Sequence, residues 1–285
     1  MTRDVASSCK CALGQRLREI SPGIAWIDGF SSYVKERSTN LVPGITPDLY
    51  EDEYRQGAGG ELEWTSRNGK RCPPKINAVY SSSALVVNSF AAWKLHLPQL
   101  ELCGSTRFSE LHFEAKVPTH LKGTPPHLDF IAGTLNRTVV AAESKLTEYL
   151  RPHRAEFAPV YASRSWPSCI KGYVSIMRQL QDNPASFVHL DAAQLIKHAF
   201  GLASLAGGND ITLLYLFWEP VNRTAHPQFE LHRQEAEQFA ATVDGASVKF
   251  SWKSYPEIWH EWASSDHDWL KLHASQLLKR YAVKI

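Results

Sequence analysis

The chain has 285 residues, of which 44% are hydrophobic and 21% charged, and its formal net charge is +2. This length allows one large α/β domain or two small ones, and the composition is that of a folded protein, which excludes a disordered or fibrous chain. A near-neutral charge neither indicates nor excludes a nucleic-acid partner, because positive charge can be confined to one groove.

No part of the sequence indicates a membrane or an export signal. The apolar runs fall well short of the roughly 20 residues that span a bilayer. The first residues are not followed by an apolar stretch like that of a signal peptide. We therefore expect a cytoplasmic protein without a membrane partner.

The cysteines and histidines do not form a recognised metal motif. The five cysteines are odd in number and widely scattered, which argues against a disulfide framework. Cys9 and Cys11 form a C-x-C pair, but no C-x-x-C follows to complete a zinc site, and the twelve histidines include no H-E-x-x-H or H-x-H pair. We expect reduced thiols with a minor structural role.

The first third of the chain contains one clear helix. Residues 1–45 have weak periodicity, which predicts a peripheral helix with loops. The glycine-rich stretch 57–62 lacks the G-K-[ST] of a phosphate-binding loop, so we interpret it as a flexible entry into the first core helix, and 73–75 as a linker. Capping serines followed by apolar residues at helical spacing predict a helix over 82–97, ended by Pro98.

A β region comes next. Residues 107–117 alternate between apolar and polar side chains, as in a half-buried strand, and 118–126 form a loop. We predict a strand over 128–132, a turn over 133–136 and a second strand over 138–145, which is rich in β-branched and small residues.

The last half of the chain alternates between helices and strands. Residues 168–181 and 190–205 are predicted helices, and the continuous apolar run 211–218 predicts a strand buried on both faces, as in the centre of a helix-covered sheet. The remaining predicted elements are an amphipathic helix over 230–243, a strand over 247–252 and helices over 256–264 and 267–282.

The order of these elements favours one α/β domain over residues 1–285. A helix, three strands, a helix and a strand fall within one region, about 80–220, which we expect to be the core. The segment 1–79 would be peripheral, and 221–285 would add helices and a strand.

Three charged residues occupy positions where charge is costly. Asp129 interrupts a predicted strand, and Glu143 and Lys145 end the next one. A turn centred near Leu135 pairs residues whose numbers sum to 270, so Asp129 faces Ala141 and Glu143 is its diagonal neighbour, about 7–8 Å away. Lys145 projects from the same face as Glu143. This assignment depends on the register, because a shift by one residue sends Asp129 to the other face.

This arrangement suits phosphate hydrolysis with a metal ion. Two carboxylates that reach inward from such a separation can share one Mg²⁺, with waters and a phosphate as the other ligands. We predict that Asp129 and Glu143 bind the metal and that Lys145 orients or helps to deprotonate the attacking water, or stabilises the phosphate.

Pro126-His127-Leu128-Asp129 followed by Glu143-Ser144-Lys145 resembles the PD-(D/E)xK, or restriction-endonuclease-like, nuclease superfamily, although two residues separate Pro126 from Asp129. The resemblance implies an αβββαβ core with a mixed central sheet flanked by helices, here with extra helices at both ends. It also implies a nuclease that uses Mg²⁺, or Mn²⁺ in its place, to cut DNA. Many nucleases of this fold pair up to cut two strands, so a homodimer is one option.

The superfamily often adds a Gln or Lys from the following helix and a further carboxylate. Gln194 fits the first role and would contact the attacking water or a phosphate; the alternative is a solvated polar face, shared with Asp191 and His198. Glu114 is the predicted further metal ligand, and Glu61 is the alternative to it.

Basic residues near the motif in the sequence could bind the nucleic acid. The predicted phosphate contacts are Lys116, Lys122 and Arg151, with Arg137 and Arg154 near them in sequence. Three alternatives remain open at this point: a structural ion-pair network, a catalytically inert nucleic-acid-binding protein, and a metal-dependent hydrolase of small phosphate esters.

Overall fold

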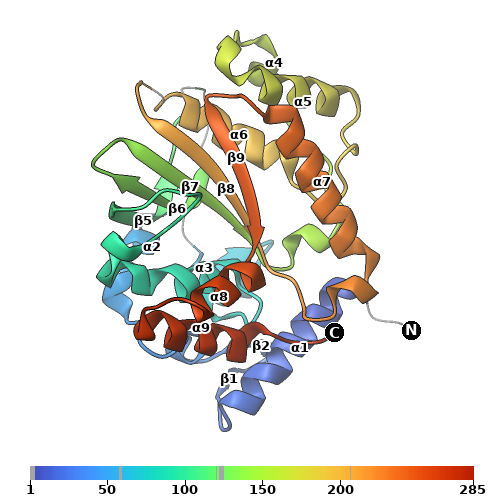
Figure 1. Cartoon of the computed structure of the whole chain (residues 1–285). Helices are drawn as coiled ribbons and strands as arrows, with labels where there is room; N and C mark the ends of the chain where they lie inside the picture. Colours follow the sequence, from blue (N-terminus) through green and yellow to red (C-terminus); the bar gives the residue numbers. More distant parts are fainter. Residues whose placement is uncertain (1–3, 58–59, 120, 122–124, 206) are drawn as a thin grey trace.

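The computed structural model describes residues 4–57, 60–119, 121, 125–205 and 207–285 and is built around a five-stranded mixed sheet (Figure 1). The spatial order of its strands is β5-β6-β7-β8-β9. The first three strands pair antiparallel, and β7, β8 and β9 run parallel. Their bounds are Phe108–Lys116, His127–Thr134, Thr138–Lys145, Asp210–Phe217 and Val248–Ser254.

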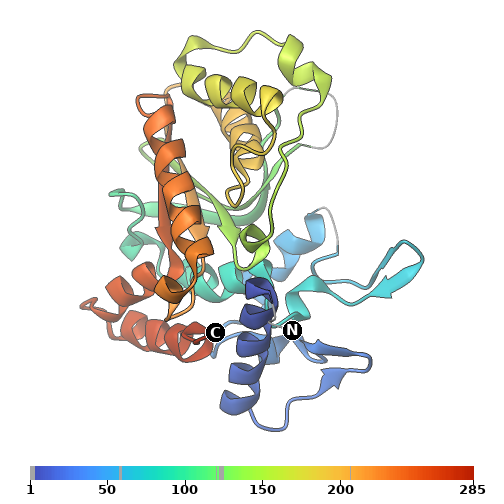
Figure 2. The same cartoon turned by 90° about the vertical axis from the view of Figure 1, so that its right-hand side faces the viewer.

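Helices cover both faces of this sheet (Figures 1 and 2). One layer holds α3 (Ser82–Phe90), α8 (Tyr255–Ala263) and α9 (Asp268–Tyr281). The other holds α5 (Lys171–Asp182), α6 (Ala192–Ala203) and α7 (Pro227–Val243). The short helices are α2 (Glu51–Gln56) and α4 (Pro159–Ser163), and α1 (Val5–Ile20) lies at the periphery. No described helix is both long and apolar enough to cross a membrane.

Aromatic contacts show which face of the sheet each layer covers. The rings of Phe90 on α3 and Phe130 on β6 lie 4.4 Å apart, and those of Phe239 on α7 and Phe250 on β9 lie 4.8 Å apart. The continuous apolar run that predicted a strand buried on both faces is β8, whose residues from Ile211 onward are all buried. It is an interior strand between β7 and β9, and the helices on both faces of the sheet account for its burial.

The predicted order of helix, three strands, helix and strand is confirmed, with changes at element ends. The α-helix predicted over 82–97 ends at Phe90 and continues as the 3-10 helix Ala91–Leu95. The predicted helix 168–181 begins as a 3-10 turn, Ser168–Ile170, before α5. Strand β9 pairs with β8 along its whole length, so the central sheet extends beyond the core predicted for 80–220.

The register of the β6–β7 hairpin differs from the prediction by one residue pair. Phe130 pairs with Ala142 and Gly133 with Val139, so the paired numbers sum to 272 and the turn is centred on Asn136 rather than Leu135. The strand β6 continues to Thr134, and Arg137 closes the turn with a φ of 62°. Such a left-handed residue at the end of a three-residue loop is a common hairpin solution. The parity of the pairing, and hence the face of each side chain, is unchanged.

Two small hairpins precede α3. The first joins β1 (Trp26–Ile27) to β2 (Phe30–Val34), and the second joins β3 (Thr65–Arg67) to β4 (Lys70–Cys72). The first lies where loops were predicted, and the second lies in a stretch for which no element was predicted. The predicted linker at 73–75 follows β4 directly, and the predicted entry at 57–62 lies partly outside the described residues.

Hydrogen bonds from a buried arginine hold the first 80 residues against the core. The Arg280 guanidinium on α9 is 2% exposed and donates to the carbonyl oxygens of Leu13 and Val79 and to the side chain of Asn40. These acceptors come from three separate parts of the first 80 residues. Since unpaired buried polar groups are costly, this arrangement holds the segment in one position on α9.

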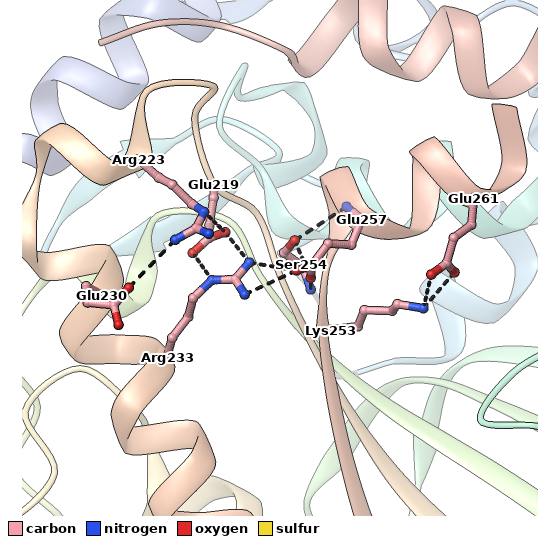
Figure 3. A network of polar contacts seen from close by, with 8 residues as sticks. All are labelled: Glu219, Arg223, Glu230, Arg233, Lys253, Ser254, Glu257 and Glu261. Carbon is pink, nitrogen blue, oxygen red and sulfur yellow. Dashed lines mark hydrogen bonds and ion pairs between the residues drawn. The ribbon is translucent and has the colours of Figure 1, made fainter. Parts of the chain in front are cut away.

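A second polar network joins the carboxyl ends of β8 and β9 to the helices (Figure 3). Glu219, just after β8, is 2% exposed and accepts two hydrogen bonds from Arg233 on α7, at 2.9 and 2.7 Å. Arg233 also donates to Glu257 on α8, and Arg223 pairs with Glu219 at 3.5 Å. Ser254, the last residue of β9, forms a capping box with Glu257 at the start of α8. The network therefore holds α7 and α8 against one end of the sheet.

Replacing Arg233 with alanine should lower the free energy of unfolding by about 3 kcal/mol, because it leaves the Glu219 carboxylate buried without its main partner. Arg55→Ala is the matched control, since Arg55 pairs with Glu51 while 60% exposed and should contribute less than about 1 kcal/mol. Urea unfolding measures both. Equal losses for the two variants would contradict the role of the buried network.

Candidate active site

Acidic and basic residues from five parts of the chain line one pocket of about 440 Å³. The pocket lies where β5, β6 and β7 approach α6 and the segment that leads into α3. The residues used below are Glu61, Glu114, Asp129, Glu143, Lys145 and Gln194. The structure thus brings together every predicted catalytic residue and both candidates for the further carboxylate.

Three of the carboxylates form a row across neighbouring strands. Phe113 pairs with Phe130 and Ala115 with Leu128, so Glu114 on β5 is aligned with Asp129 on β6. The observed β6–β7 register aligns Asp129 with Glu143 on β7, and not with Ala141 as predicted. Aligned residues of adjacent strands project from the same face, so Asp129 and Glu143 are direct neighbours instead of diagonal ones.

The Glu143 carboxylate is almost fully buried and has a partner on each oxygen. Lys145 Nζ donates to its Oε1 at 2.6 Å, and His198 Nε2 lies 2.9 Å from its Oε2. Lys145 Nζ also donates to Gln194 Oε1 at 2.7 Å. Gln194 and His198 are four residues apart on α6, which places them on the same side of that helix. The solvated polar face weighed for Gln194 is therefore wrong.

The helix that supplies these partners is itself fixed by carboxylates. The Asp191 side chain caps α6 by accepting a hydrogen bond from the backbone N–H of Gln194 at 3.0 Å. The Glu235 carboxylate on α7 accepts three backbone N–H bonds, at 2.6–2.8 Å, from residues 188–190 just before α6. Both contacts satisfy backbone N–H groups that lie at or just before the start of α6. They therefore help to determine the position of α6 relative to β7.

The carboxyl groups of Asp129 and Glu143 differ in how readily they ionise. Burial and then the charge of Glu143 raise the pKa of Asp129 well above its usual range, although Asp129 Oδ2 accepts a 2.7 Å hydrogen bond from Ser144 N. Burial also acts to raise the pKa of Glu143, but Lys145 and His198 more than offset it and bring that pKa to about 2. The charge of Glu143 raises the pKa of Lys145 in spite of its burial. One carboxylate is thus firmly ionised beside another that resists ionisation.

Two further carboxylates, Glu114 and Glu61, line the same pocket. Burial and then the nearby Glu61 raise the pKa of Glu114 to about 7. Glu61 is bound by Lys75 Nζ and Ser83 Oγ, each at 2.5 Å, and Glu114 Oε2 lies 3.5 Å from His127 Nδ1. Both side chains therefore line the site, and neither contacts Glu143 by a hydrogen bond.

The predicted nucleic-acid contacts are dispersed. Lys116 is exposed, and its Nζ donates to the carbonyl of Gln56 at 3.0 Å, while Arg151 is exposed near the rim of the pocket. Lys122 lies outside the described residues. Arg137, near the motif in sequence, closes the β6–β7 turn at the far end of the hairpin. Arg154 is exposed after β7.

Two contributors to the site were not assigned a role from the sequence. His198 was noted on the polar side of its helix, but its contact with Glu143 was not predicted. The four-residue step from Gln194 to His198 was the available signal. Lys75 was interpreted as part of a linker, and nothing in its local sequence indicated its bond to Glu61.

The donors in the pocket suit a hard cation of the Mg²⁺ type. Such an ion takes oxygen ligands and commonly uses one or two carboxylates, which Asp129 and Glu143 could supply from aligned positions. Within the described residues, no group of three or more His, Cys, Asp or Glu side chains is arranged to hold a metal. The predicted set of Asp129, Glu143 and Glu114 is thus not assembled around one point, and its role in metal binding stays a prediction.

Comparison with known proteins shows a family match. The chain matches a family described as "Restriction Endonuclease associating with ARP" over residues 40–282, which is more than half of its length. No curated protein and no solved structure matches it significantly. The match confirms the resemblance to restriction-endonuclease-like proteins, and the mixed sheet flanked by helices is consistent with such a fold. The chain therefore belongs to the family of restriction endonucleases associating with ARP.

Proposed function

We propose that the protein is a Mg²⁺-dependent nuclease that hydrolyses phosphodiester bonds of DNA in the pocket between β5–β7 and α6. One observation carries this proposal. In a chain that belongs to a restriction endonuclease family, Asp129 and Glu143 are aligned on adjacent strands, and Lys145 is hydrogen-bonded to Glu143. Carboxylates and an ammonium group enclosed together in a pocket are costly to place, and such clusters are concentrated at functional sites.

The Glu143 and Asp129 carboxylates would hold the cation. When bound there, Mg²⁺ supplies an acidified water and neutralises charge on the attacked phosphate, and Mn²⁺ can do the same. His198 holds Oε2 of Glu143 and so fixes the rotation of that carboxylate. The backbone N–H of Ser144 does the same for Oδ2 of Asp129. The two ligands are thus oriented before substrate binds, which lowers the cost of assembling the site.

Lys145 is the residue best placed to act on the water or the phosphate. Its ammonium group has three N–H donors, and the described residues accept from it at Glu143 Oε1 and Gln194 Oε1. The third N–H is then available to orient the attacking water or to stabilise the charge that develops on the phosphate. Gln194 acts here by holding Lys145 in position, which adds to its predicted contact with the water.

Positive charge at the rim of the pocket supports DNA as the substrate. Lys10 on α1 lies over the ring of Tyr80, a residue of the pocket wall, at 4.2 Å. Burial, and then the charge of Arg151, lower the pKa of Lys10. Two cations are therefore close together beside the pocket, where a phosphate backbone would relieve their repulsion.

Association with other chains is the remaining part of the proposal. With one site per chain, two copies acting together would cut both strands of a duplex, so we include a homodimer, which sedimentation of the protein tests. The family's description names association with ARP, and we propose a corresponding association for this chain.

Substitutions in the site should strongly reduce cleavage and leave the fold intact. Glu143→Gln and Lys145→Met should each reduce the rate of cleavage of duplex DNA in Mg²⁺ by at least about 100-fold, because each removes a charge from the reacting region. Glu237→Gln, an exposed position on α7, is the control and should cleave like the wild type. Circular dichroism checks the fold of each variant.

Three results would count against the proposal. Cleavage that survives both site substitutions would place the chemistry elsewhere. Binding of DNA by the wild type without cleavage in Mg²⁺ or Mn²⁺ would favour an inert binding protein. Hydrolysis of a small phosphate ester such as p-nitrophenyl phosphate, without hydrolysis of DNA, would favour the alternative hydrolase.

The cation should be measurable without any cleavage assay. Titration calorimetry with Mn²⁺ should show binding to the wild type and to Lys145→Met, and loss of that binding in Asp129→Asn and Glu143→Gln, since only the latter two lose a ligand. Chelation of the metal should stop cleavage, and excess Mg²⁺ should restore it. Mn²⁺ binding that is unchanged in both carboxylate variants would contradict the assignment of the ligands.

A further inference from the structure

A basic hairpin projects from the body of the protein beside the site (Figure 2). It consists of β3 and β4 joined by Asn68-Gly69, and its cross-strand pairs run from Thr65–Cys72 to Arg67–Lys70. Both turn residues have a positive φ, 52° and 73°, as a two-residue type I′ turn requires. The segment 64–74 contains three basic residues and no acidic one.

The base of this hairpin is part of the pocket wall. The segments that flank the hairpin remain hydrogen-bonded to each other beyond Cys72. Lys75 N donates to the carbonyl of Gly60 and Ile76 N to that of Glu61, each at 3.0 Å. The side chains of Glu61 and Lys75 form an ion pair and line the same pocket as Asp129. The hairpin is thus joined directly to the proposed catalytic pocket, and its orientation is coupled to that wall.

Two of the hairpin's cations are exposed, and no carboxylate among the described residues neutralises them. Lys70 and Arg71 are both exposed, and neither forms an ion pair with a described acidic residue. The Arg71 guanidinium lies 4.4 Å from the ring of Trp64, which in turn contacts Phe30 edge-on at 6.2 Å. These contacts stabilise the position of the arginine by a modest amount and do not neutralise its charge.

We propose that the basic hairpin enters the major groove of a DNA duplex whose scissile phosphate lies in the pocket, with Lys70 and Arg71 binding phosphates that flank the groove. This inference rests on the proposed nuclease function. Asn68 is seven positions after Glu61, so the tip reaches at most about 25 Å from the pocket wall. The major groove is about 12 Å wide and admits a two-stranded β-ribbon. Contacts with phosphates position a protein on the duplex.

The charge pattern favours DNA over an acidic protein as the partner. A hairpin that bound a protein surface would be expected to present apolar anchors, yet Thr65, Ser66, Asn68 and Lys70 at its outer part are all polar and exposed. The aromatic residue at its base, Trp64, is 40% exposed, and the Arg71 guanidinium lies over its ring. Polar and cationic side chains on a narrow ribbon suit phosphates and water-filled grooves.

The double variant Lys70→Ala/Arg71→Ala tests the inference. Binding of a duplex of about 30 base pairs is measured by fluorescence anisotropy over a range of salt concentrations, in the Glu143→Gln background so that no DNA is cut. Removing two phosphate contacts should weaken binding about 10-fold or more, and should reduce the slope of log K against log salt by about 2. Lys249→Ala/Lys271→Ala is the control with the same change of charge, at exposed positions on β9 and α9, and should bind as the parent does.

Catalysis separates this inference from the proposed function. With Glu143 intact, the hairpin variant should raise KM and leave kcat at saturating DNA unchanged. A variant that binds and cleaves as the control does would overturn the hairpin's role and leave the nuclease proposal standing. Absence of DNA binding and cleavage in the wild type would overturn both proposals.

The groove itself can be identified by chemical protection. Guanine N7 is a major-groove atom, so the wild-type protein should protect N7 from methylation at a fixed distance from the cut bond, and the hairpin variant should not. Protection confined to minor-groove atoms would contradict entry into the major groove.

Discussion

The buried ion pair between Lys145 and Glu143 is the contact on which the site depends. An ionised carboxylate with almost no exposure is expensive unless its charge and its lone pairs are compensated. Lys145 compensates the charge, and His198 occupies the second oxygen. The two partners come from different elements, because Lys145 lies on the same strand as Glu143 and His198 lies on α6. The capping of α6 by Asp191 and the three N–H bonds to Glu235 therefore serve the site, since they determine where His198 and Gln194 lie.

Two buried charge networks in the protein have different designs. Around Glu219, both carboxylate oxygens and the Arg233 guanidinium are enclosed by partners from four neighbouring segments, and the network joins sheet and helices. Around Glu143, two basic partners are also present, but the adjacent Asp129 carboxyl has a raised pKa because of burial and a like charge. The first network holds structural elements together. The second lies in a pocket beside a carboxyl group that resists ionisation, and a bound cation would favour the ionised form of that group.

The sequence made the central features predictable because they depend on local patterns. Asp129, Glu143 and Lys145 stand out as charges inside strand-like runs, and the face that they share depends only on parity, which survived the change of register. The exact pairing was not predictable, because it depends on the left-handed conformation of Arg137, a residue type that adopts it rarely. The polar side of α6 was visible, but the rotation of that helix toward Glu143 is a tertiary property. The Asn68-Gly69 turn was a readable signal for a hairpin.

The most direct measurement is a crystal structure of the protein with Mn²⁺ and a DNA duplex, with the metal located by its anomalous scattering. The account predicts a metal peak between Asp129 and Glu143, within about 2.2 Å of an oxygen of each and of a phosphate oxygen, with Lys145 Nζ in contact with that phosphate or its water. A metal bound elsewhere while the DNA phosphate lies in this pocket, or a duplex bound away from the pocket, would contradict it.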